Sequence, residues 1–209
     1  MGRYTGPVCR ICRRAGEKLF LKGERCLTPK CGVERRPTPP GVHGAARRRR
    51  VSERGIQLRE KKRARAIYGV LERQFSKYFD EATRKPGVTG QYLLQLLERR
   101  LDNVVFRLGF GDSRAQARQL IGHGHITING RKVDVPSFKV SIGDKVGWRE
   151  SSKNSEYFKT LLQDLNRRPM PRWLTLDAQA VTGSVTALPE PADMDLKIDE
   201  RLIVEFYAR

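Results

Sequence analysis

Four cysteines are the residues whose type and spacing most directly suggest chemistry. Cys9, Cys12, Cys26 and Cys31 are separated by two, thirteen and four residues, and the 209-residue chain has no other cysteine. Two close pairs of thiols joined by a loop have the spacing of tetrahedral zinc sites. Nearby arginines and lysines favour the thiolate form that binds metal. The pattern predicts one structural zinc ion held by four thiolates.

Other fates for these thiols are a disulfide framework, an iron–sulfur cluster and a catalytic metal. Disulfides are disfavoured, because the N-terminus lacks an apolar export signal. An iron–sulfur cluster also accepts four thiolates and stays open on spacing alone. Catalysis is disfavoured, because four cysteines close the coordination sphere and the chain has no His-x-Glu motif of the kind found in zinc deaminases. We therefore expect the metal to replace a hydrophobic core in this segment.

The charge of the chain points to a polyanionic partner. The formal net charge is +19 and the pI is about 10.4. Residues 1–66 hold 20 of the 42 Lys and Arg but only 5 of the 23 Asp and Glu. Such an excess favours nucleic acid, whose phosphates would neutralise it. A basic solubilising tail is the alternative, which the cysteines disfavour because they suggest local order. No apolar run approaches the ~20 residues of a membrane span.

The N-terminal half reads as an arm followed by helices. Residues 1–45 contain scattered Gly and Pro without periodicity, which predicts an extended, loop-rich arm. Helices are expected at 53–68, between Leu71 and Pro86, and from Thr89 onward, and they should pack as a small bundle.

The second half mixes helices and strands. Asp102 and Ser113 are expected to cap two short helices joined by a Gly-containing turn. Asn129-Gly130 between alternating residues predicts a hairpin. Further strands are expected at 145–149, 173–177 and 184–188, and a helix at 153–166. Residues 199–207 are ambiguous, since β-branched residues favour a strand and Asp199 as a cap favours a helix.

Several short motifs between residues 99 and 146 occur together. They are Arg100-Leu101-Asp102, Ser113-Arg114-x-x-Ala117-Arg118-Gln119-Leu120-Ile121, His123-Gly124-His125-Ile126, Ile128-Asn129-Gly130 and Ile142-Gly143-Asp144. In this order they resemble the S4 RNA-binding domain family, in which two short helices and a hairpin present one basic surface to RNA. The resemblance implies RNA contacts by Arg114, Arg118, His123, His125, Arg131 and Lys132.

The basic residues of this stretch also have simpler interpretations. Arg114 and Arg118 are four residues apart and share a helix face, which suits phosphate binding, and an ordinary solvated helix face is the alternative. His123 and His125 could cap the end of a helix and bind nothing. RNA helices hide their base edges in a deep groove, so a basic convex surface would read backbone and shape.

The resemblance extends to both ends of the chain. Further matching motifs are Met1-Gly2-Arg3-Tyr4-Thr5-Gly6-Pro7, Pro40-Gly41-x-His43-Gly44, Gln57-Leu58-Arg59-Glu60-Lys61, Leu71-Glu72-Arg73-Gln74-Phe75, Leu101-Asp102-Asn103-Val104-Val105-Phe106-Arg107-Leu108-Gly109-Phe110 and Leu202-Ile203-Val204-Glu205-Phe206-Tyr207. The chain thus resembles the S4 family of small-subunit ribosomal proteins, in its bacterial type with an N-terminal four-cysteine motif.

The resemblance implies a cytoplasmic structural protein of the small ribosomal subunit. Members bind small-subunit ribosomal RNA early, nucleate subunit assembly, contact neighbouring small-subunit proteins and affect translational accuracy. They also border the channel through which messenger RNA enters. In this family the RNA-binding domain is inserted in a helical domain, and the C-terminal element returns to it, which favours a helix for 199–207.

We therefore expect an α+β protein with a metal-stapled extended arm (1–45), a helical domain (46–98), an inserted S4-type domain of two short helices and a small antiparallel sheet (99–190) and a returning C-terminal segment (191–209). A second basic surface is expected from Arg47, Arg48, Arg49, Arg50, Arg59, Lys61, Lys62, Arg63 and Arg65. The arginine run is typical of a solvated or backbone-binding patch, and its position in the family suggests contact with messenger RNA.

Two other functions compete with this interpretation. S4 domains also occur on RNA-modifying enzymes, which need a separate catalytic domain. The residues outside 99–149 are instead expected to form a cysteine arm, a small bundle and a short tail, and they show no Walker loop, no Gly-rich nucleotide-binding fold and no synthase-like Asp motif. We therefore expect no enzyme activity and no small-molecule substrate. The other rival is a zinc-containing RNA-binding regulator that acts off the ribosome.

Overall fold

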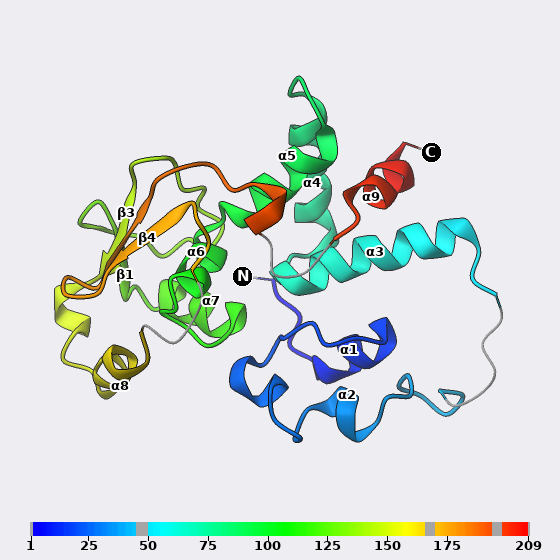
Figure 1. Ribbon diagram of the computed structural model, residues 1–209, viewed down its shortest axis with the longest axis horizontal. Helices are drawn as coiled ribbons and strands as arrows, with labels where there is room; N and C mark the ends of the chain where they lie inside the picture. Colours follow the sequence, from blue (N-terminus) through cyan, green and yellow to red (C-terminus); the bar gives the residue numbers. More distant parts are fainter. Residues whose placement is uncertain (1, 45–49, 166–169, 194–197, 209) are drawn as a thin grey trace. The chain divides into compact units, whose positions relative to one another are not determined.

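The computed structural model describes residues 2–44, 50–165, 170–193 and 198–208 (Figure 1). The chain divides into two compact units, each of which is described by itself. Unit 1 contains residues 1–94 and 196–209, and unit 2 contains residues 95–195. Unit 1 is helical where it is described, and unit 2 combines helices with an antiparallel sheet, so the expected α+β class is confirmed.

The arm of unit 1 contains more regular structure than the sequence predicts. Helix α1 (Cys9–Ala15), a 3-10 turn (Gly23–Cys26) and helix α2 (Gly32–Arg35) follow one another within it. The expectation of an extended arm is thereby corrected. Segments of four to seven residues span too few turns to produce a periodic apolar pattern, which is why the sequence did not reveal them.

Three longer helices follow in the expected places. They are α3 (Glu53–Tyr68), α4 (Glu72–Thr83) and α5 (Thr89–Glu98), the last of which crosses from unit 1 into unit 2. The Ser52 hydroxyl caps α3 by accepting the Gly55 N–H. Helix α3 ends at Gly69, whose φ of +62° lies in the region that favours glycine.

The C-terminal segment forms a helix, as the family resemblance favoured. Helix α9 (Glu200–Tyr207) is capped by Asp199, whose carboxylate accepts the backbone N–H groups of Arg201 and Leu202. It packs along α3 in unit 1. The Tyr207 ring stacks on Phe79 of α4 with ring centroids 4.2 Å apart. The β-branched residues here do not decide the structure, because packing of one apolar helix face outweighs local propensity.

Unit 2 contains the two short helices and the hairpin. Helix α6 (Leu101–Arg107) precedes α7 (Arg114–Gly122), and the Ser113 hydroxyl caps α7 by accepting the Gln116 N–H. The expected cap of α6 is wrong. Arg100 occupies the N-cap position without a side-chain cap, and Asp102 lies inside the helix, where its carboxylate binds arginines instead.

The hairpin joins an antiparallel sheet. Among the described residues the sheet has the order β2-β1-β3-β5-β4. The strands are β1 (Ile126–Ile128), β2 (Arg131–Lys132), β3 (Lys145–Trp148), β4 (Leu174–Asp177) and β5 (Thr182–Val185). Asn129 and Gly130 have φ values of 50° and 80°, as the expected tight turn between β1 and β2 requires. β5 begins two residues earlier than predicted.

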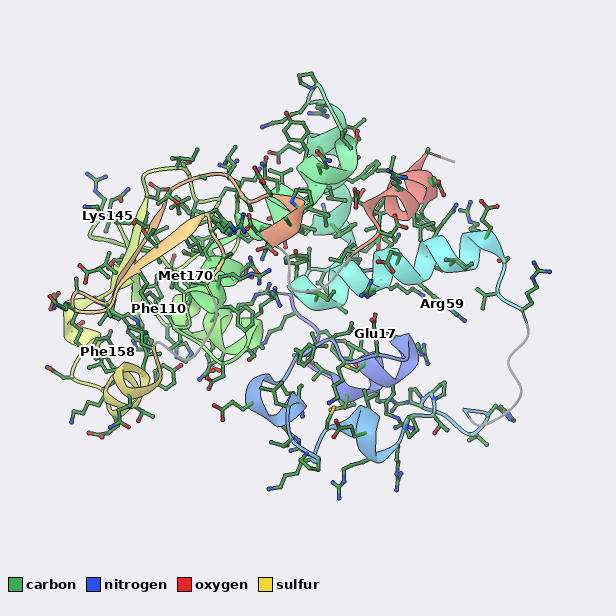
Figure 2. All side chains as sticks on the ribbon, in the orientation of Figure 1. Glu17, Arg59, Phe110, Lys145, Phe158 and Met170 are labelled. Carbon is green, nitrogen blue, oxygen red and sulfur yellow. The ribbon has the colours of Figure 1, made fainter. Side chains whose placement is uncertain are left out.

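One hydrophobic core joins the sheet to the helices of unit 2. Trp148 of β3 lies at its centre, with its ring centroid 5.3 Å from Phe158 of helix α8 (Glu156–Asp164) and 6.1 Å from Phe110. Figure 2 shows Phe110 and Phe158 close to each other and Lys145 apart from them. Burial of such an aromatic side chain stabilises a fold by about 1.5–3 kcal/mol. This core fixes α6, α7 and the hairpin as one platform.

Candidate metal centre and nucleic-acid interface

The four cysteines come from three consecutive short elements and meet at one pocket. Cys9 and Cys12 lie one turn apart on α1, Cys26 ends the 3-10 turn, and Cys31 immediately precedes α2. All four line the same pocket, together with Val8, Leu21, Lys22, Arg25, Gly32 and Val33. All four are free thiols; Cys9 is half-buried and the other three are buried.

Local backbone contacts hold these thiols in place. The Lys22 N–H donates to Cys26 Sγ over 3.4 Å. A Cβ added at Gly32 would lie 2.9 Å from Cys9 Cβ and 3.2 Å from Cys9 Sγ, so only glycine allows α2 to approach α1 this closely. Burial raises the pKa of the Cys12 thiol, and the three neighbouring cysteines raise it further against a backbone hydrogen bond from Leu19.

The donor chemistry and the shared pocket fit a four-thiolate centre. As the side chains stand, however, no three His, Cys, Asp or Glu residues within the described ranges are arranged so that they could hold an ion. The sequence-based expectation of zinc therefore stays a prediction, and so does the alternative of an iron–sulfur cluster.

Helix α3 divides its basic residues between two environments. Arg59 and Lys62 are exposed, and Figure 2 shows Arg59 projecting from α3. Lys61, in contrast, is only 6% exposed: its Nζ lies 2.7 Å from Glu72 Oε1 and 4.1 Å from the centroid of the Phe206 ring. Lys61 thus faces α4 and α9, and the structure gives no support to phosphate contact by this residue.

The other predicted cations of α3 also have protein partners. Arg63 binds Glu60 at 2.8 Å and Glu17 of the arm, and Arg65 binds Glu72. Arg50 is exposed, whereas Arg47, Arg48 and Arg49 fall outside the described residues. The sequence predicts one basic surface for this region, but a helical period of 3.6 residues distributes such a run over every face.

Glu72 connects three elements of unit 1. Its carboxylate accepts hydrogen bonds from Lys61 and from the Tyr207 hydroxyl, the latter over 3.0 Å. Burial would raise the pKa of Glu72, but these bonds and the Arg65 charge outweigh it and hold the pKa below its ordinary value. Burial and the same carboxylate raise the pKa of Tyr207.

In unit 2 both arginines of α7 are half-buried and bind α6. Arg118 Nε donates to Asp102 Oδ2 over 3.0 Å. Arg114 Nε donates to Asn103 Oδ1 over 2.7 Å, and its guanidinium lies 4.6 Å from the centroid of the Phe106 ring. These are not the loose cations of a solvated helix face.

The two histidines differ in their surroundings. His123 is exposed at the end of α7, as expected for a capping or surface residue. His125 is half-buried, with Nδ1 2.9 Å from the Ser152 hydroxyl. Burial lowers the pKa of His125, and the charges of His123 and Arg149 lower it further. The lowered pKa favours the neutral imidazole, which disfavours a role of His125 as a cation for phosphate.

The hairpin carries exposed cations next to the end of α7. Arg131 and Lys132 of β2 are both exposed. A Cβ added at Gly124 would lie 2.3 Å from Lys132 Cε, so the lysine side chain passes directly over the end of α7. Lys145 and Arg149 are also exposed here and were not predicted. The available signal was in the sequence, where the charged Lys145 and Arg149 alternate with the apolar Val146 and Trp148, so that the two kinds of side chain fall on opposite faces of a strand.

No helix in the described part of the chain is long and apolar enough to span a membrane.

The chain matches known families along most of its length. The model of the ribosomal protein S4/S9 N-terminal domain matches residues 3–98, and the model of the S4 domain matches residues 99–146. Small ribosomal subunit protein uS4 of Desulfitobacterium hafniense is 59% identical over 209 residues, and that of Thermus thermophilus is 54% identical over 209 residues. Small ribosomal subunit protein uS4A of Symbiobacterium thermophilum is 56% identical. Each alignment covers 100% of both chains.

Proposed function

The chain belongs to the uS4 family of small ribosomal subunit proteins, and from this we propose that it binds small-subunit ribosomal RNA through one basic surface in each unit. It is a structural component of the small subunit, located in the cytoplasm with neighbouring small-subunit proteins as partners. The family implies a structural rather than an enzymatic role. The identity of more than half of all positions over the full length carries this assignment.

The exposed cations support the two-surface proposal. In unit 1 they include Arg59 and Lys62 on α3, and in unit 2 Arg131 and Lys132 on β2. Exposed lysines and arginines neutralise phosphates and release counterions, so each contact steepens the salt dependence of binding. Two surfaces on one chain also raise the effective concentration of the second contact once the first has formed.

A salt series on the full chain tests this proposal. Arg59→Ala/Lys62→Ala and Arg131→Ala/Lys132→Ala should each lower the log–log salt slope of RNA binding by about 1.4 to 1.8 units. Lys153→Ala/Lys159→Ala is the matched control, because these cations already pair with Glu150 and Glu156 beside them. A slope that responds to only one of the two surface pairs would reduce the mechanism to a single surface.

We also propose that the protein joins the ribosomal RNA early and nucleates subunit assembly. A structural protein whose cations contact RNA on two surfaces is suited to hold RNA helices together before other proteins arrive. Time-resolved reconstitution of small subunits should find it among the first proteins bound, and its omission should block later additions. Unimpaired assembly without it would contradict this role.

For the arginine run Arg47–Arg50 we propose contact with messenger RNA where it enters the subunit. Replacement of the four arginines by glutamines should leave incorporation into subunits intact but slow the unwinding of structured messages. Translational accuracy should be measured on the same subunits. Normal unwinding would assign the run to ribosomal RNA instead.

We further propose one structural zinc ion held by Cys9, Cys12, Cys26 and Cys31. The convergence of four thiols on one pocket supports it. Metal analysis combined with X-ray absorption should give about one zinc per chain in a four-sulfur environment at about 2.3 Å. Two disulfides without metal would contradict the proposal, and iron with inorganic sulfide would replace zinc by a cluster.

The alternative function is a zinc-containing regulator that binds RNA off the ribosome. Co-sedimentation separates the two, because a subunit component stays with small subunits at moderate salt. Recovery of the protein only in the unbound fraction would favour the regulator.

A further inference from the structure

The carboxylate of Asp102 binds two arginines that lie at different depths. Arg100 donates to it from Nε over 3.0 Å and from Nη2 over 2.7 Å, and Arg118 donates from Nε over 3.0 Å. The side chains of Asp102 and Arg100 are each 2% exposed, whereas that of Arg118 is 14% exposed. Asp102 therefore connects one wholly internal arginine with one whose edge reaches the surface.

Asn103, the next residue of α6, binds Arg114, the other arginine of α7. Asn103 accepts from Arg114 Nε over 2.7 Å, and its Nδ2 donates to Glu98 Oε2 over 2.6 Å. Glu98 in turn pairs with Arg107, with Oε1 2.9 Å from Nη2. Successive residues of α6 thus fix both arginines of α7, and buried acceptors stand behind each of them.

The network holds its charges in close pairs. Asp102 is shared by Arg100 and Arg118, and Glu98 pairs with Arg107. A buried carboxylate needs partners of this kind, because an unpaired charge in the interior is strongly unfavourable. The result is an Arg118 guanidinium that a buried carboxylate holds in one orientation while its edge stays at the surface.

We propose that Asp102 is a positioning residue of the RNA-binding surface, which holds the Arg118 guanidinium in an orientation from which it donates to an RNA phosphate. The inference rests on the proposed RNA-binding function and adds to it a residue that does not touch RNA. A side chain that is already fixed loses less conformational entropy on binding, which is worth about 0.5–1.5 kcal/mol for a long side chain. That range corresponds to a roughly two- to twelve-fold difference in affinity.

Asp102→Asn gives the sharpest test, because charge and positioning predict opposite results. The variant raises the net charge of the chain by one, which by itself strengthens RNA binding. Glu156→Gln raises the net charge equally at a carboxylate that is 88% exposed and pairs only locally with Lys159. Both are measured in the full chain, against a small-subunit ribosomal RNA transcript, over a series of salt concentrations.

We expect Asp102→Asn to bind RNA two- to twelve-fold more weakly than Glu156→Gln, with a similar salt slope. Arg118→Ala should lower the slope by about 0.7 to 0.9 units, and Arg118→Lys should restore the slope but not the affinity. Thermal unfolding of each variant identifies those that are folded at the assay temperature. If Asp102→Asn is not folded there, the comparison of Arg118→Ala with Arg118→Lys provides the test.

Equal affinities of Asp102→Asn and Glu156→Gln would overturn the inference. An unchanged salt slope in folded Arg118→Ala would do the same, and the network would then serve only to clamp α6 to α7. Failure of the wild-type chain to bind the transcript would instead contradict the proposed function itself, so the two failures are distinguishable.

Discussion

Helices α3 and α7 have similarly basic sequences but use their cations differently. Among the cations between residues 59 and 65 of α3, Arg59 and Lys62 are exposed, whereas the other three bind carboxylates of unit 1. On α7, both arginines bind polar side chains of α6. The longer helix has enough turns to separate a surface face from a packing face, whereas the shorter one buries Ala117 and Ile121 and holds its cations at the rim. The partner of a cation, more than its presence, therefore indicates its role.

The largest effect on stability should come from removing the buried carboxylate of Glu98, which pairs with Arg107 of α6. Glu98→Ala leaves the Arg107 guanidinium, 5% exposed, without its buried carboxylate, so we expect a loss of about 3–5 kcal/mol in the free energy of unfolding of unit 2. Both tryptophans of the chain, Trp148 and Trp173, lie in unit 2, so urea unfolding followed by tryptophan fluorescence reports this unit selectively. Glu98→Gln, which retains the shape of the side chain, should lose less stability. An unchanged midpoint would show that the network is dispensable.

Adjacent lysines on α3 provide a sharper contrast with opposite expectations. Lys61→Ala removes a charged hydrogen bond to Glu72 and should cost about 1.5–3 kcal/mol of stability without changing the salt slope of RNA binding. Lys62→Ala should change stability by less than about 0.5 kcal/mol.

For Lys62→Ala we also expect the salt slope to fall by about 0.7 to 0.9 units. Circular dichroism at the helix band measures stability, because unit 1 contains no tryptophan. If the two variants behaved alike, the division of α3 into a packing face and an RNA face would be wrong.

The sequence was most informative where local chemistry decides the structure. Ser52 and Ser113 cap helices as expected, and Asn129-Gly130 makes the predicted turn, because these signals depend only on neighbouring residues. Asp102 shows the limit of such reasoning. Its position suggested a helix cap. Instead, the Asp102 carboxylate binds Arg118, which lies 16 residues later in the chain, and this contact exists only because α6 and α7 pack together.

The candidate RNA-binding residues show the same limit more strongly. Composition identified the cation-rich segments, but burial separated Lys61 from Lys62, and no sequence pattern placed Glu72 beside Lys61. Lys145 and Arg149 lie outside the helix and the hairpin to which the family resemblance assigns RNA contacts, so it does not imply them. The spacing of the four cysteines predicts that they converge on one pocket. It does not determine whether the thiols bind zinc or an iron–sulfur cluster.

Acid should weaken unit 1 through Glu72. Its pKa is lowered in the folded state, so its stabilising contribution is present above the ordinary value of 4.5 and is lost as the pH falls through the folded pKa. Thermal melts followed by circular dichroism should therefore show a falling Tm below pH 4.5. Glu72→Gln should flatten this dependence, and Glu24→Gln, a change at an exposed carboxylate of the arm, should leave it unchanged. Identical pH profiles for wild type and Glu72→Gln would contradict the role of the carboxylate.

The smallest expected effect concerns His125, a half-buried basic residue that contrasts with the exposed cations of unit 2. The pKa of His125 in the folded state lies below its ordinary value of 6.5. Between the folded pKa and 6.5, the unfolded chain therefore binds more protons than the folded one. The free energy of unfolding of unit 2 should consequently rise with pH through this window and become level above pH 6.5. His125→Gln should remove the rise, while His43→Gln in the arm should retain it. At pH 7.5 His125→Gln should also leave the salt slope of RNA binding unchanged, since a neutral imidazole releases no counterion. A lowered slope at that pH would show that His125 is protonated on the RNA and belongs with Arg131 and Lys132 among the phosphate contacts.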